Sequence, residues 1–217
     1  MSNQLLGQLY QVIVLIFLTI IHEVSHGLMA YKLGDNTAKD AGRLTLNPIK
    51  HLEFFGSFFV PLLFIMTNSP FILGWAKPVP FNPYNLKDPK RDGALIALAG
   101  PVSNFLIAII FGLMVRLMAG IPAVAADPIL GNVLMLVNVI VFVSLLLGFF
   151  NLIPIPPFDG SRIVFAFLSH KAERFWLQLE QYGTLLIILL LFGGLLNLLY
   201  PVVIFSYHLL VGPAAIF

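Results

Sequence analysis

Four long runs of apolar residues constrain what this 217-residue chain can fold into. They cover about residues 5–33, 93–118, 131–151 and 183–206, and each has roughly the 20 residues that a helix needs to cross a bilayer. Hydrophobic residues make up 59% of the chain and charged residues 10%, against roughly 25% charged in a typical soluble domain. Because lipid offers the backbone no hydrogen bonds, such runs fold as helices. We therefore predict an all-α polytopic membrane protein with one domain over residues 1–217.

A fifth apolar segment, residues 54–75, differs from the other four. Pro61 lies inside it, residues 67–70 read Thr-Asn-Ser-Pro, and a lysine flanks it on either side. We expect a re-entrant segment whose ends return to the same face of the membrane, although two short tilted spans would also fit. The next residues, 75–81, contain Pro78 and Pro80, which favour an extended backbone.

Lysine and arginine are unevenly distributed along the chain. Of the 12, eight lie between residues 32 and 91 and three more lie between the third and fourth runs, whereas residues 120–130 contain none. Cytoplasmic loops carry an excess of basic residues. We therefore predict a multi-pass protein of the cytoplasmic membrane with both termini outside and both basic loops in the cytoplasm.

The first apolar run contains the string His22-Glu23-Val24-Ser25-His26, and Glu23 is the only charged side chain between residues 1 and 31. Ionisable groups inside a membrane are costly and need a reason. Residues four apart lie on the same face of a helix, so His22 and His26 can offer two nitrogens to one zinc ion while Glu23 handles protons. The alternative is a pair of histidines that hydrogen-bond to neighbouring helices.

Asp159 is the candidate for a third ligand. It follows an uncharged run, residues 128–158, at the expected cytoplasmic end of the third span, where three prolines unwind the helix. Irregular backbone at this depth can line a cavity. The alternative role is an N-cap for a helix that begins near Ser161. The chain has no cysteine, so thiolate ligands and disulfides are excluded.

The second apolar run carries small residues on one face. Gly93, Ala97, Gly100 and Asn104 follow helical spacing, and small residues let another helix approach closely. Asn104 then points inward, either toward the candidate site as a substrate-binding residue or simply as a hydrogen-bonding link between helices.

Three motifs in this order resemble the site-2 protease family of intramembrane zinc metalloproteases. They are H-E-x-x-H-G over residues 22–27, G-P-x-x-N over residues 100–104, and N-x-x-P-x-P-x-x-D-G over residues 151–160. Phe158 stands where the family often has leucine. The resemblance is to a minimal prokaryotic member without PDZ or CBS domains.

The resemblance implies roles for individual residues. His22, His26 and Asp159 are the implied ligands of one zinc ion per chain, Glu23 is the implied general base, and Asn151 is implied to hold the substrate or stabilise the oxyanion. It also implies a three-helix catalytic core, an additional C-terminal helix, and a membrane-embedded loop that engages the substrate strand.

The function that we predict is zinc-dependent hydrolysis of peptide bonds in transmembrane segments of single-pass membrane proteins. The chain's partners would then be such substrates, the lipid bilayer and, in an oligomer, further copies of itself. A net charge of +2 gives no indication of nucleic-acid binding. The alternatives are a catalytically silent membrane scaffold, a metal-binding or transport protein, and a membrane-anchored protease that cuts soluble loops. A membrane-anchored protease of the last type needs a later glutamate ligand and a sizeable soluble domain, and neither is evident in the sequence.

Overall fold

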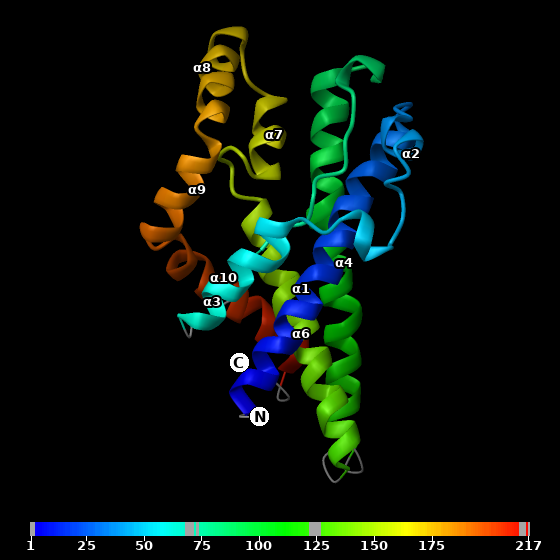
Figure 1. Cartoon of the computed structure of the whole chain (residues 1–217), viewed down its shortest axis with the longest axis vertical. Coiled ribbons are helices and arrows are strands. Elements are labelled where there is room, and N and C mark those ends of the chain that lie inside the picture. The colour runs from blue at the N-terminus through cyan, green and yellow to red at the C-terminus, as the bar shows by residue number, and fades with distance from the viewer. Residues whose placement is uncertain (1–2, 68–71, 73, 122–126, 213–215, 217) are drawn as a thin grey trace.

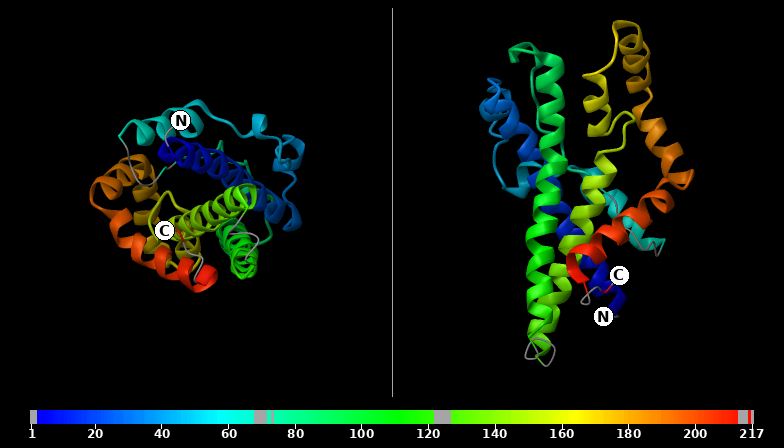
Figure 2. Two further views of the ribbon diagram at one scale, coloured as in Figure 1. Left: turned by 90° about the horizontal axis from the view of Figure 1, so that it is seen from below. Right: turned by 180° about the vertical axis from the view of Figure 1, so that it is seen from behind.

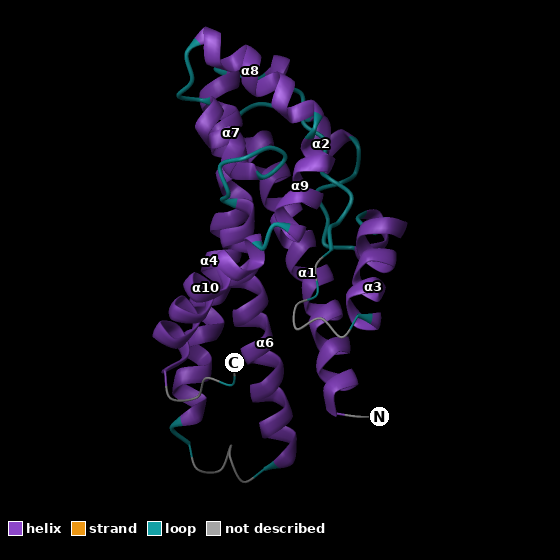
Figure 3. Cartoon of the chain, turned by 90° about the vertical axis from the view of Figure 1, so that its left-hand side faces the viewer, coloured by secondary structure: helices purple, strands orange, loops and turns teal. Residues whose placement is uncertain are grey.

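The computed structural model describes residues 3–67, 72, 74–121, 127–212 and 216. No strand occurs among these residues, and every regular element is helical (Figure 3). In this described part of the chain, three helices are long and apolar enough to cross a membrane, which confirms the predicted all-α membrane class. These helices are α1 (Asn3–Lys32), α4 (Pro89–Ala119) and α6 (Pro128–Asn151). The shorter helices are α2 (Thr37–Asp40), α3 (Val60–Met66), α7 (Asp159–Phe165), α8 (His170–Gln181), α9 (Gly183–Phe192) and α10 (Leu195–Val211), with helical turns η1 (Pro48–Lys50), η2 (Phe55–Phe59) and η3 (Pro83–Asn85).

The long helices α1, α4 and α6 pack against one another and form the centre of the molecule (Figure 1). Helix α10 lies against α4 and α6, as two further views show (Figure 2). Their shared core is apolar: Val115 of α4, Val141 of α6 and Val203 of α10 are fully buried. Packing of these apolar faces fixes the relative positions of the helices that carry the candidate site.

The starts of α4 and α6 follow from local sequence. Each has an aspartate immediately before a proline at the first helical position. Asp88 accepts a hydrogen bond from the backbone N–H of Arg91, and Asp127 accepts from the N–H of Ile129. An acceptor at the N-cap and a proline at the first position both favour helix initiation.

The expected fourth span over residues 183–206 is not one continuous helix. The structure divides it into α9 and α10, which meet at Gly193 and Gly194. Gly194 has a φ of +84°, a left-handed conformation that glycine adopts without a steric penalty. The two adjacent glycines therefore end α9 and turn the chain into α10, where hydropathy alone predicts continuity.

In the fifth apolar segment, η2 and α3 form one helical stretch of 12 residues, about 18 Å long. This is shorter than a hydrocarbon core of roughly 30 Å. The N–H of Trp75 donates to the carbonyl of Gly56 at 3.1 Å, so the two ends of the segment lie together. Whether the segment re-enters or crosses the membrane stays a prediction, and residues 68–71 and 73 lie outside the described residues.

The molecule has two distinct ends (Figure 1). Helix α2, the start of α4, α7 and α8 lie at one end, and the start of α1 and the end of α4 lie at the other. Parts of both basic loops lie at the first end, namely α2 and the start of α4 from the first loop and α7 and α8 from the second, whereas α3 lies away from it. Within the first of these loops, residues 74–82 form no helix and run as an extended segment, as Pro78 and Pro80 predict.

Candidate metal centre

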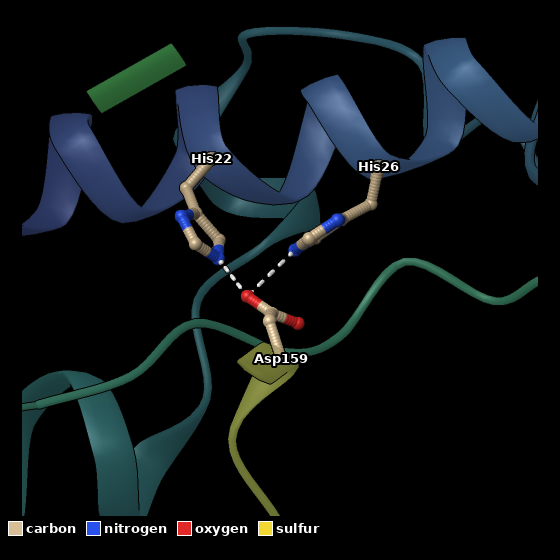
Figure 4. A group of neighbouring side chains, drawn as sticks. All are labelled: His22, His26 and Asp159. Atoms are coloured by element: carbon tan, nitrogen blue, oxygen red, sulfur yellow. Dashed lines mark hydrogen bonds and ion pairs between the residues drawn. The ribbon is translucent and has the colours of Figure 1, made fainter. Parts of the chain in front are cut away.

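Three potential metal ligands converge between α1 and the start of α7 (Figure 4). His22 Nε2 lies 3.0 Å from Asp159 Oδ2, and His26 Nε2 lies 3.3 Å from the same oxygen. One ligand atom from each residue lies within 4.8 Å of the other two. The structure thus brings together the three residues that the sequence analysis names as metal ligands.

Helix α1 places the two histidines. They are one turn apart on the same face, and both rings project toward Asp159 (Figure 4). Their centroids lie 4.6 Å apart with the rings nearly perpendicular. The residue His22 is only 5% exposed, so the pair is withdrawn from solvent.

The chain after α6 places Asp159. Helix α6 ends at Asn151, and the proline-containing turn leads into α7, which begins at Asp159. A Cβ atom on Gly160 would lie 2.2 Å from the carbonyl oxygen of Leu152, so only glycine allows α7 to start this close to the end of α6. The N-cap of α7 is Phe158, and Asp159 directs its carboxylate to the histidines. The structure therefore does not support the alternative of a capping aspartate.

Helix α4 passes close to both histidine rings at Gly100. A Cβ atom on Gly100 would lie 2.5 Å from His26 Nε2 and 2.6 Å from His22 Nε2. No side chain fits at this position without displacing a ring. The absence of a side chain on Gly100 leaves space at the two nitrogens that would bind a metal.

Helix α4 also provides the partners of the outer ring nitrogens. His26 Nδ1 lies 2.7 Å from the carbonyl oxygen of Ile96 and donates to it, which leaves Nε2 unprotonated and able to bind a metal. His22 Nδ1 lies 3.1 Å from the amide nitrogen of Asn104, which is fully buried. The Oδ1 atom of this amide has no hydrogen-bond partner among the described residues. A half-turn of the amide would let Oδ1 accept from Nδ1–H of His22 and free its Nε2 for a metal.

These features fit a zinc ion. Zinc takes nitrogen and oxygen ligands in tetrahedral geometry, and two ligand atoms each about 2.0–2.1 Å from the metal are about 3.3 Å apart. The two separations between nitrogen and oxygen, 3.0 and 3.3 Å, are close to that spacing. Three protein ligands leave a fourth position for water or substrate, as in catalytic zinc sites.

Glu23 is adjacent to His22 on α1, and its Oε2 accepts a hydrogen bond of 2.9 Å from the backbone N–H of Val79. The extended segment thus passes directly beside the candidate general base. Sequence reasoning did not identify this contact, because it depends on the path of a segment 56 residues further along the chain.

Asn151 is the predicted site residue that the structure does not join to this group. It is the last residue of α6, and its amide nitrogen donates to the carbonyl oxygen of Leu147, one turn earlier in the same helix. Asn104, in contrast, contacts a candidate ligand directly, behind the ring rather than on the side that faces Asp159. Its observed position suits orientation of His22 better than the predicted contact with substrate.

Comparisons with known proteins agree with this geometry. The sequence model of Peptidase family M50 matches residues 10–193. The "Putative zinc metalloprotease YwhC" of Bacillus subtilis is 39% identical over 183 residues, which cover 83% of this chain and 79% of that protein. The proteins named "Putative zinc metalloprotease Rip2" of Mycolicibacterium smegmatis and Mycobacterium tuberculosis are each 27% identical over 177 residues, which cover 82% of this chain and 64% of each relative. No solved structure matches the chain. From the family match over most of its length and the identity to YwhC, the chain belongs to peptidase family M50, the site-2 protease family.

Proposed function

We propose that this protein is a zinc-dependent endopeptidase that hydrolyses peptide bonds of transmembrane segments within the membrane. The observation that carries the proposal is the convergence of His22, His26 and Asp159 beside Glu23, on a helix apolar and long enough to span a bilayer. Metal binding alone does not require a glutamate inside an apolar helix, whereas hydrolysis requires a base at that place.

The ligand set would hold one zinc ion per chain. When bound, zinc would lower the pKa of a coordinated water toward about 7 and polarise the peptide carbonyl. Glu23 would accept the proton as water attacks, and would then deliver it to the leaving amine nitrogen. The Asn151 amide is our candidate donor to the oxyanion, and this role requires it to leave its bond to Leu147.

The substrate strand would lie along the extended segment. A transmembrane helix must unwind before cleavage, because its carbonyls are occupied by intrahelical hydrogen bonds. Pro78 and Pro80 have no N–H, and the N–H groups of Lys77 and Val79 already donate to His51 O and Glu23 Oε2. The carbonyls of Lys77 and Pro78 already accept from Arg43, so a substrate strand would pair here chiefly through its own N–H donors and the other carbonyls of the extended segment.

We also propose the membrane orientation that the charge distribution predicts. The protein would reside in the cytoplasmic membrane with both termini outside, and the site would open to the cytoplasm at the end that carries α2, α7 and α8. The substrates would be single-pass membrane proteins, and assembly into a homo-oligomer would be compatible with this topology. Labelling of single cysteines introduced at Lys50 and Ile129 tests the orientation, because the account places them on opposite sides of the membrane.

Comparison of membrane-protein fragments between cells with the wild-type chain and cells with Glu23→Gln tests the proposed function. Fragments cut within predicted transmembrane segments should be present with the wild type and absent with the variant. Glu180→Gln is the matched control, since Glu180 is exposed on α8 and lies outside the ligand group. An identical fragment set in wild-type and Glu23→Gln cells would contradict the proposal.

A further inference from the structure

Arg43 is a buried cation, and no carboxylate of the described residues pairs with it. It follows α2, and the whole residue is 8% exposed. Its Nη2 donates to the carbonyl oxygen of Lys77 at 2.8 Å and to that of Pro78 at 3.3 Å. Among the described residues, it forms no ion pair within 4.0 Å, and its Nε has no acceptor. A guanidinium that is withdrawn from water needs compensation from its surroundings.

One peptide group lies between Arg43 and Glu23. The carbonyl of Pro78 accepts from Arg43, and the N–H of the same peptide group, which belongs to Val79, donates to Glu23 Oε2 at 2.9 Å. The negative end of the peptide dipole therefore faces the cation, and the positive end faces the carboxylate. Hydrogen bonds in such a chain polarise one another, so each strengthens the next.

A titratable side chain, His51, lies near Arg43. Burial lowers the pKa of His51, and the nearby charge of Arg43 lowers it further. His51 Nε2 contacts the carbonyl oxygen of Thr45 at 2.8 Å, and the backbone carbonyl of His51 accepts from Lys77 N–H, also at 2.8 Å. The loop thus binds the extended segment at Lys77, just before the Pro78 carbonyl, and helix α1 binds it at Val79, just after that carbonyl.

From this arrangement we infer that Arg43 is a positioning residue for Glu23, which acts through the Pro78–Val79 peptide group. The inference rests on the proposed function, because it assigns Arg43 to the base of that reaction. By fixing and polarising the peptide group, Arg43 holds the Glu23 carboxylate in one orientation beside the ligand group. It does so without contact with the substrate or the metal.

Kinetics of the purified full-length chain test this role, with a single-span reporter that the wild type cleaves and Glu23→Gln does not. Arg43→Gln should lower kcat by at least about tenfold while KM stays within about twofold and zinc content is unchanged. Arg43→Lys retains the charge but not the planar fork of donors, and should recover part of kcat. Lys50→Gln removes an exposed positive charge from the same loop and should behave as the wild type. A wild-type kcat in Arg43→Gln would overturn the inference. A fall in kcat together with a rise in KM and a loss of bound zinc, none of which Arg43→Lys reverses, would overturn it as well.

Hydrogen exchange provides a readout that does not depend on activity. Pro78 and Pro80 have no amide hydrogen, so the Val79 amide is readily resolved in peptides that cover this segment. Its exchange should accelerate in Arg43→Gln and in Glu23→Ala, and Arg43→Gln should add nothing in the Glu23→Ala background. Should Arg43→Gln give no stable protein, Arg43→Lys takes its place, and exchange at Val79 equal to the wild type overturns the inference.

The two measurements separate the inference from the proposed function. If the wild type cleaves no reporter, the proposed function fails, and exchange at Val79 still decides whether Arg43 is coupled to Glu23. If the wild type cleaves and Arg43→Gln matches it in kcat or in exchange at Val79, the inference fails alone.

Discussion

His22 Nδ1 lies 3.1 Å from the amide nitrogen of Asn104, and this contact joins α1 to α4. Asn104 is fully buried. The same helix α4 accepts from His26 Nδ1 through the carbonyl of Ile96. Both rings that face Asp159 are therefore held from behind by α4. Partners of this kind fix the tautomer and orientation of metal-binding histidines.

Substitution of Asn104 should weaken zinc binding more than it affects the fold. Asn104→Leu is close in volume but removes the partner of His22 Nδ1, and zinc affinity should fall by about 10–100-fold. Competition with a zinc chelator measures this change. Asn138→Leu is the control, because Asn138 is an equally buried asparagine that pairs with Tyr207 away from the site. Equal zinc affinity in wild type and Asn104→Leu would contradict the assigned role.

Gly100→Ala should displace the histidines. The added Cβ would lie 2.5–2.6 Å from both Nε2 atoms, a distance at which something must move. We expect loss of bound zinc and of cleavage, measured as metal content and reporter turnover. Gly93→Ala on the same helix meets nothing within 4 Å and should retain both. Full zinc content in Gly100→Ala would contradict this expectation, since it would show that α4 or the rings can shift to accommodate the methyl group.

Asp159→Asn should weaken zinc retention, because a neutral amide replaces the only carboxylate of the ligand group. Metal content after dialysis against a chelator measures the effect, with Asp127→Asn at the far end of α6 as the control. Unchanged zinc content in Asp159→Asn would exclude Asp159 as a ligand.

Asp35 should stabilise the region after α1 in a pH-dependent manner. It is fully buried, and burial alone would raise its pKa. Hydrogen bonds from Thr37, Asn82 and Asn85 outweigh burial and lower the pKa. The pKa of Asp35 is lower in the folded than in the unfolded state. Its contribution to the free energy of unfolding is therefore complete above the unfolded pKa of about 3.9, and it is lost as the pH falls through the folded pKa.

Asp35→Asn should therefore cost about 1–3 kcal/mol of stability at neutral pH. The difference in melting temperature between wild type and variant should shrink below about pH 4. Asp40→Asn, at an exposed position of α2, is the control. A difference that stays constant down to pH 3 would contradict this account.

The ligand group was accessible from sequence because each member leaves a strong local signal. His22 and His26 are polar residues at helical spacing in an apolar run, and Asp159 ends a long uncharged run at a proline-rich turn. The space at Gly100 could be predicted in part, since small residues follow one face of the second apolar run. That it faces both histidines depends on how α1 and α4 cross, and a single helical pattern does not specify a crossing.

Two contacts near the site between side chains and the backbone of distant segments could not be predicted. Val79 reaches Glu23, and Arg43 reaches the Pro78 carbonyl, through the path of an extended segment and a loop. Neither contact needs a particular side chain at residue 78 or 79, so the sequence carries no direct signal for it. The break between α9 and α10 was missed for another reason: hydropathy is insensitive to the left-handed conformation of Gly194.

Cleavage by the purified protein tests the central claim most directly. Wild type and Glu23→Gln are loaded with zinc to the same stoichiometry, reconstituted in liposomes with a single-span reporter, and compared for cleavage within the transmembrane segment. The account predicts cleavage by the wild type and none by Glu23→Gln at equal zinc content, since the variant retains the ligands and loses the base. Equal cleavage by both proteins would contradict it.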